Sequence, residues 1–330
     1  MAFLRRVFLQ LATPAIALVA LTSITCAQDW PTRPVTMVVP FAAGGATDVL
    51  ARVLGAQLSE LLGQQIIVEN IGGAGGMTGS ARVAKAPPDG YQFVLGSTGT
   101  HAANQTLYKH PLYNAMTDFT PVMLVVEQPI ALITRKDLPA RNLAEFIAYA
   151  KTNQAKMHYG SPGAGAMVQL ACAMLNAAIG IDVTHVPYRG GVPAIQDLLG
   201  GRIDYYCGVS TTAIPLIAGN QVNAIALLTR NRSPSLPALA TAHEQGLADF
   251  DTPIWYAIFL PKNTPWAIVQ KLHAAAVAAV DIPAVRRRLQ EIGADVPPPE
   301  RRSPAYLQRF VESEVKKLAT AIKAAGLAEQ

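Results

Sequence analysis

Short apolar runs alternate along the chain with longer segments whose apolar residues recur every three or four positions. Three such runs near the start are rich in Val, Ile or Phe, as buried strands are: residues 34–40, 65–69 and 93–96. Between the first two, the leucines and valines from Leu50 to Leu62 fall on one face of a helix. We expect this helix to begin with Thr47 or Asp48 as its N-cap.

The same alternation starts again after Pro121. It predicts strands at 157–160, 183–186, 203–206, 222–228 and 254–260. It predicts helices at 142–152, 166–179, 265–280, 283–292 and 303–325, and one that starts at Pro193, a residue that favours the first helical position. The first series also contains a short helix at 78–85. Two successive series of strands and helices indicate an α/β protein with two lobes, each a mostly parallel sheet flanked by helices.

The first 27 residues have the layout of an export signal. Arg5 and Arg6 precede an apolar stretch, and the small residues Thr25 and Ala27 flank Cys26 before the expected cleavage. We therefore predict a secretory signal peptide at 1–27 and a soluble, periplasmic mature protein. Acylation of Cys26 is the alternative, although the residues before it suit a lipoprotein poorly.

The loops that follow the predicted strands are rich in Gly, Ser and Thr and almost free of charge. They are residues 41–47, 97–101, 161–166 and 188–192. In parallel sheets, ligands bind outside the carboxyl ends of the strands. Glycine leaves backbone N–H groups accessible, and a helix N-terminus adds partial positive charge. Such loops suit an anion such as a carboxylate, although any one of them taken alone could be an ordinary turn.

Charge and motifs argue against several other classes of protein. The formal charge is +5, and basic residues gather only at Arg286–Arg288 and Arg301–Arg302, so we predict no nucleic-acid partner. No nucleophile elbow, phosphate loop or H-E-x-x-H motif occurs. His101 is the one histidine in a candidate ligand loop, and a structural role is the favoured interpretation. Cys172 and Cys207 could form a disulfide or remain two buried thiols.

The segment Pro40–Asp48 resembles the signature P-F-x-x-G-G-x-x-D of the solute receptors of tripartite tricarboxylate transporters, also called Bug or TctC-like receptors. Further segments resemble that family in the same order along the chain: Val68–Asn70 with Gly73–Gly76, Asp89–Tyr91, Thr100–Ala102 with Asn104, Leu107–Tyr108, Asp118–Val122, Tyr159–Gly165, Val186–Gly190, Pro193–Ala194, and Asp197–Gly201 with Asp204. The resemblance spans nearly the whole chain after the predicted signal peptide.

This resemblance implies a type II-like periplasmic-binding-protein fold with a ligand cleft between two lobes. Residues 28–125 with 248–330 would form domain 1, and residues 126–247 domain 2. The implied function is capture of a small organic carboxylate, a di- or tricarboxylate or an aromatic acid, for the membrane components of the transporter. We expect a monomer without catalytic activity, cofactor or metal. Two alternatives stay open: a ligand receptor for a sensor kinase, and an α/β enzyme acting on a small carboxylate.

The resemblance also assigns ligand contacts to loops of both lobes. The expected residues are Phe41, Ala42, Ala43, Gly44, Gly45, Thr47, Ser97, Thr98 and Thr100 in the first lobe, and Ser161, Gly163, Ala164, Gly165, Ala166, Tyr188, Arg189, Cys207 and Gly208 in the second. Family members often carry Ser and His where this chain has Ala166 and Gln169, and many carry Asp where it has Cys207-Gly208. The missing acidic group argues against an amino-acid ligand, and the more apolar second loop favours a longer or aromatic acid.

Overall fold

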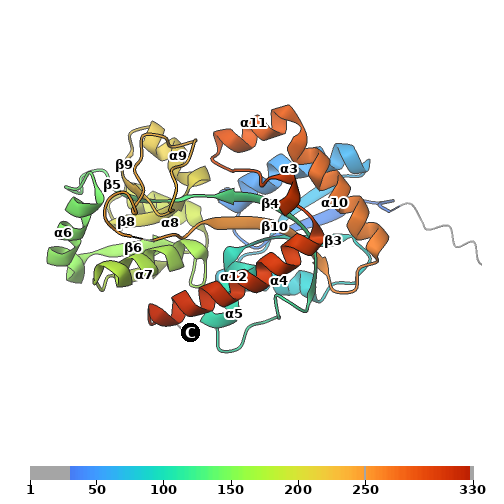
Figure 1. Ribbon diagram of the computed structural model, residues 1–330, viewed down its shortest axis with the longest axis horizontal. Coiled ribbons are helices and arrows are strands. Elements are labelled where there is room, and N and C mark those ends of the chain that lie inside the picture. The colour runs from blue at the N-terminus through green and yellow to red at the C-terminus, as the bar shows by residue number, and fades with distance from the viewer. Residues whose placement is uncertain (1–29, 249, 328–330) are drawn as a thin grey trace, which may run out of the picture.

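Two five-stranded sheets, each covered by helices, form the two lobes of the structure (Figure 1). The structure is a computed structural model that describes residues 30–248 and 250–327. The predicted signal peptide lies outside the described residues. Within the described part of the chain, no single helix is long and apolar enough to cross a membrane.

The first sheet has the strand order β2-β1-β3-β10-β4. Its strands are β1 (Val35–Val39), β2 (Ile66–Asn70), β3 (Gln92–Ser97), β4 (Phe119–Gln128) and β10 (Ile254–Pro261). Only β10 runs antiparallel to its neighbours. The helical segments of this lobe are α3 (Ala46–Leu62), η1 (Ala74–Gly76), α4 (Met77–Ala84), the π-helical turn η2 (Gly99–Ala103), α5 (Asn104–Leu107), α10 (Trp266–Asp281), α11 (Pro283–Glu291), η4 (Pro299–Arg301) and α12 (Pro304–Ala324).

The second sheet repeats this plan with the order β7-β6-β8-β5-β9. Its strands are β5 (Ile130–Arg135), β6 (His158–Ser161), β7 (Thr184–Pro187), β8 (Tyr205–Val209) and β9 (Val222–Leu227). Here β5 is the antiparallel strand. The helices are α6 (Leu143–Asn153), η3 (Gln154–Lys156), α7 (Met167–Ile179), α8 (Gly191–Leu199) and α9 (Ser210–Ala218). A disulfide between Cys172 on α7 and Cys207 on β8 decides the alternative that the sequence left open.

Two predicted helix starts are wrong. Helix α3 begins at Ala46 with Gly45 as its N-cap, so Thr47 and Asp48 lie in its first turn. Asp48 reaches back instead and accepts a hydrogen bond from the Gly44 N–H at 2.9 Å. Helix α8 begins at Gly191, which makes Pro193 its third residue. Proline fits there because the first four N–H groups of a helix have no partner within the helix.

The chain passes between the lobes at Pro129, which joins β4 to β5, and returns between β9 and β10. Buried hydrogen bonds tie the lobes together at this hinge. The Ser210 hydroxyl at the start of α9 donates to the Gly293 carbonyl at 2.8 Å, and the Gln128 amide at the end of β4 donates to the Ser210 hydroxyl at 3.2 Å. The predicted domain limits agree with this course but stay a prediction.

Candidate functional site

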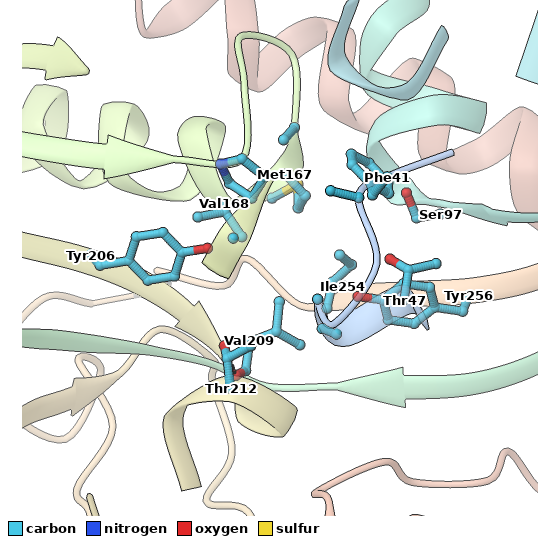
Figure 2. A pocket seen from close by; sticks show the side chains of 16 residues that line it. Phe41, Thr47, Ser97, Met167, Val168, Tyr206, Val209, Thr212, Ile254 and Tyr256 are labelled. Atoms are coloured by element: carbon cyan, nitrogen blue, oxygen red, sulfur yellow. Dashed lines mark hydrogen bonds between the residues drawn. The ribbon is translucent and has the colours of Figure 1, made fainter. Parts of the chain in front are cut away.

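A narrow chamber of about 40 Å³ lies between the two lobes (Figure 2). First-lobe residues on its wall are Phe41, Ala42, Gly45, Ala46, Thr47, Ser97, Ile254 and Tyr256, and second-lobe residues are Pro162, Ala166, Met167, Val168, Gly191, Tyr206, Val209 and Thr212. Figure 2 shows Tyr206 and Val168 on one side of the chamber and Phe41, Thr47 and Tyr256 on the other. The chamber therefore needs both lobes to exist.

The first-lobe loop between β1 and α3 is held in place from beneath by Asp48. Its carboxylate accepts hydrogen bonds from the Gly44 N–H and, at 3.0 Å, from the Asn70 amide, which also donates to the Phe41 carbonyl at 3.1 Å. Burial raises the pKa of Asp48, but the bonds from Arg52, Gly44 and Asn70 outweigh it and the pKa is lowered. The ionised carboxylate thus fixes the loop without pointing into the chamber.

The second-lobe loop after β6 is held by a buried serine. The Ser161 hydroxyl lies 2.7 Å from Nε2 of His185 and accepts a hydrogen bond from the Gly163 N–H at 3.1 Å. Burial lowers the pKa of His185 to about 4, so its ring is neutral near pH 7. Gly163 has a φ of +135°, a backbone conformation that residues other than glycine rarely adopt. Ser161 and Gly163 therefore shape the loop, and Pro162 and Ala166 present it to the chamber.

Four helices begin at the chamber wall, and three of them (α3, α7 and α8) start from the predicted loops. They are α3 with Ala46 and Thr47, α7 with Met167 and Val168, α8 with Gly191, and α9 with Thr212. The first N–H groups of each helix lack partners inside the helix, and each N-terminus carries about half a positive charge. Among the residues that the structure describes, no Asp, Glu, Lys or Arg lines the chamber. Its positive potential therefore comes from backbone dipoles rather than from cations.

Hydroxyl groups complete the polar part of the wall. They belong to Thr47, Ser97, Thr212, Tyr206 and Tyr256. Burial raises the pKa of both tyrosines well above the usual range, so the phenols stay protonated and can donate hydrogen bonds. The remaining wall is apolar, from Phe41, Met167, Val168, Val209 and Ile254. An anionic group with a short apolar chain fits such a surface.

The structure brings only some of the expected ligand residues to the chamber. Ala43, Gly163, Ala164, Tyr188 and Arg189 line a wider hollow at its mouth, together with part of the first loop. Gly44 lines a groove on another side of the chamber.

Six expected residues line none of these hollows: Ser161, which holds the second-lobe loop as described above, and Thr98, Thr100, Gly165, Cys207 and Gly208. Thr98 accepts a hydrogen bond from the Trp255 N–H at 2.8 Å, and Thr100 bonds to Ser97 and His101. Cys207 is buried in the disulfide, whereas Gly165 and Gly208 pack against protein atoms. Any ligand contact from these six stays a prediction.

Several residues that line the chamber were not predicted, because they lie outside the loops that follow the strands. Ile254 and Tyr256 lie on β10, and Tyr206 lies on β8. Thr212 lies in the first turn of α9. The sequence marks Tyr206 and Tyr256 only as strand residues, and nothing local distinguishes a strand face that borders a cleft from one that borders the core.

The lobes touch directly around the chamber, so the structure is closed. A Cβ placed on Gly190 of the second lobe would lie 2.7 Å from Ala42 Cβ of the first. A Cβ on Gly44 would lie 3.3 Å from the Val192 side chain. The Tyr108 hydroxyl of the first lobe donates to the Ala164 carbonyl of the second at 2.8 Å.

Known proteins resemble this chain in both sequence and fold. Residues 50–327 match the family described as the tripartite tricarboxylate transporter family receptor. The periplasmic binding protein BugD is 39% identical, with a TM-score of 0.88 over 91% of this chain and 100% of its own. MatC from Rhodopseudomonas palustris, solved with malate, is 39% identical, with a TM-score of 0.86 over 89% of this chain and 100% of its own.

A further R. palustris protein, solved with adipate, is 36% identical, with a TM-score of 0.87 over 91% of this chain and 100% of its own. These matches confirm the predicted two-lobe periplasmic-binding-protein fold and the absence of an enzymatic role. The chain belongs to the receptor family of tripartite tricarboxylate transporters, whose members are periplasmic solute-binding proteins.

Proposed function

We propose that this protein captures a small organic carboxylate in the periplasm and presents it to the membrane components of a tripartite tricarboxylate-type transporter. One observation carries the proposal: the N-termini of α3, α7, α8 and α9 meet at a chamber to which the described part of the chain contributes no charged side chain. The predicted signal peptide and the family support export. MatC and its R. palustris relative were solved with malate and adipate, both dicarboxylates, which supports the same class of ligand here.

The chamber can replace the hydrogen bonds that a carboxylate loses when it leaves water. A carboxylate accepts about four hydrogen bonds. Backbone N–H groups of α3 and α7, with the Thr47 and Tyr206 hydroxyls, can supply them from both lobes. Because donors from the second lobe reach the ligand only when the cleft closes, the ligand stabilises the closed form by its additional contacts there. The transporter would then recognise the closed form.

The same wall disfavours an amino acid as ligand. An α-ammonium group buried without a carboxylate or several acceptors is costly. Residues 30–248 and 250–327 place no acidic side chain in the chamber, and the chamber's hydroxyls are already needed for the acid group. We therefore expect dicarboxylates first and aromatic acids second, with acidic amino acids binding more weakly than the corresponding diacids.

A thermal-shift screen tests this proposal. Ligands would be mono-, di- and tricarboxylates, aromatic acids and acidic amino acids, each also tested as its neutral amide. At a hundredfold excess over its Kd, a true ligand adds about 2.7 kcal/mol to the free energy of unfolding, and its amide should add none. If no acid raises the melting temperature more than its amide does, carboxylate capture is refuted. If only the amino acids do so, the argument from the uncharged wall is wrong.

A further inference from the structure

The chamber is too small to enclose a whole ligand. Its volume is about 40 Å³, whereas an apolar cavity that holds benzene has about 150 Å³. The closed chamber therefore holds one acid group and little of the attached chain. The rest of the ligand has to lie in a space that opens from the chamber.

Two such spaces share wall residues with the chamber. The mouth, of about 770 Å³, shares Phe41, Ala42 and Pro162. The side groove, of about 330 Å³, shares Gly191 and Thr212. Both are large enough for several carbon atoms, so their chemistry decides which one a charged group would enter.

Of the described residues that line the mouth, Arg189 is the one with a charged side chain. It is exposed, and no ion pair engages it within the part of the chain that the structure describes. The nearby Asp197 is already bound, since it pairs with Arg202 at 2.5 Å and accepts the Tyr188 hydroxyl at 2.7 Å. Arg189 thus presents an uncompensated positive charge beside the route into the chamber.

The side groove has the opposite character. Its wall consists largely of Val49, Val192, Ile195, Pro215 and Leu216, with Gln196 and two threonines as its polar side chains. A carboxylate placed there would lose water without gaining a cation, which is costly. In the wide mouth it would keep much of its water and still be attracted by Arg189.

We infer that the mouth is the subsite for the second acid group of a dicarboxylate, and that Arg189 is the residue that favours diacids over monoacids. This inference rests on the proposed function, because it assumes that the first acid group occupies the chamber. Since Arg189 is exposed to solvent, the expected preference is modest, about two- to fivefold in Kd.

Calorimetry with adipate and its monomethyl ester tests the inference, because the two have the same chain and differ by one negative charge. In Arg189→Gln, the Kd for adipate should rise about two- to fivefold, and the Kd for the ester should stay unchanged. Raising the salt concentration should reduce the wild-type preference for adipate. Arg287→Gln, which removes an exposed arginine from α11, controls for the change in net charge and should alter neither Kd.

Other outcomes overturn the inference while separating it from the proposed function. If Arg189→Gln weakened the binding of adipate and of the ester equally, Arg189 would shape the loop and would not interact with the second carboxylate. If Val192→Asp weakened adipate more than the ester, and Arg189→Gln did not, the side groove would hold the second group. If monoacids bind and diacids do not, the subsite is refuted and carboxylate capture stands. If no carboxylate binds, the proposed function itself fails.

Discussion

His101 shows that a polar residue in a loop of the ligand-binding type can serve the core instead. It is fully buried and stacks on Phe259, with ring centroids 3.9 Å apart and planes 7° from parallel. Its Nδ1 lies 2.9 Å from the Thr100 hydroxyl, and among the described residues its Nε2 has no hydrogen-bond partner. Burial without a counter-charge lowers the pKa of His101 to about 3. The structural interpretation favoured from the sequence is thereby confirmed.

Stability should fall in mild acid because of this ring. The unfolded chain binds a proton at a histidine near pH 6.5, but folded His101 does so only near pH 3, so stability present above pH 6.5 is lost between these values. His185, with a pKa lowered to about 4, adds to the same trend. In His101→Phe, the slope of unfolding free energy against pH should drop by up to about 1.4 kcal/mol per unit. Urea denaturation from pH 4 to 7 measures this slope. If the wild-type protein and His101→Phe had the same slope, the lowered pKa of His101 would be contradicted.

At the scale of elements, the sequence predicted most strands and helices but not their complete pairing. Strong periodicity placed α3 and α12 to within about two residues. The strands β4 and β5 were not predicted, because Phe119–Arg135 reads as one apolar stretch in which Pro129 alone marks the passage between lobes. The antiparallel direction of β10 could not be predicted either. It depends on how a strand that follows the whole second lobe re-enters the first sheet.

The disulfide joins two elements that build the second-lobe wall. Cys172 lies on α7, whose first residues line the chamber, and Cys207 lies between the wall residues Tyr206 and Val209 on β8. The bond closes a loop with a sequence separation of 35. By the chain-entropy estimate it stabilises the fold by about 4 kcal/mol.

Replacing both cysteines by alanine should therefore lower the free energy of unfolding by about 4 kcal/mol. Ligand affinity should change less than about twofold, because neither sulfur lines the chamber. Urea denaturation and calorimetry with the best ligand measure the two quantities. The wild-type protein treated with reductant after unfolding serves as a comparison. A large loss of affinity with little loss of stability would mean that the bond positions the wall and does not merely stabilise the lobe.

At the scale of the whole molecule, closure depends on glycine where the lobes meet. The second-lobe turn at Ala164 and Gly165 fits against Gly75, Asn104 and Tyr108 of the first lobe. A Cβ on Gly165 would lie 2.7 Å from both Asn104 Oδ1 and the Tyr108 ring. The turn can dock only because no side chain stands between the two backbones. These contacts exist only in the closed form, so a change in them should act on binding without touching the ligand.

Gly75 and Gly63 form a matched pair that separates closure from backbone strain. Both have left-handed φ values, +59° and +69°, so alanine strains each by about 1–2 kcal/mol. A Cβ on Gly75 would lie 2.5 Å from the Ala164 carbonyl oxygen, whereas a Cβ on Gly63 would have nothing within 4 Å. Gly75→Ala and Gly63→Ala should thus lose similar stability in the absence of ligand.

Only Gly75→Ala should then bind ligand at least about tenfold more weakly, because about 1.4 kcal/mol or more of closing free energy is lost. Small-angle scattering with saturating ligand should show that Gly63→Ala closes fully and Gly75→Ala does not. If both variants bound ligand equally well, the contact between Gly75 and Ala164 would contribute nothing to the free energy of closure. The ligand's own contacts would then have to hold the lobes together. If both bound equally poorly, the loss would come from strain within the first lobe. A difference between the two is therefore the signature of a receptor in which the fit of one backbone against the other sets the affinity.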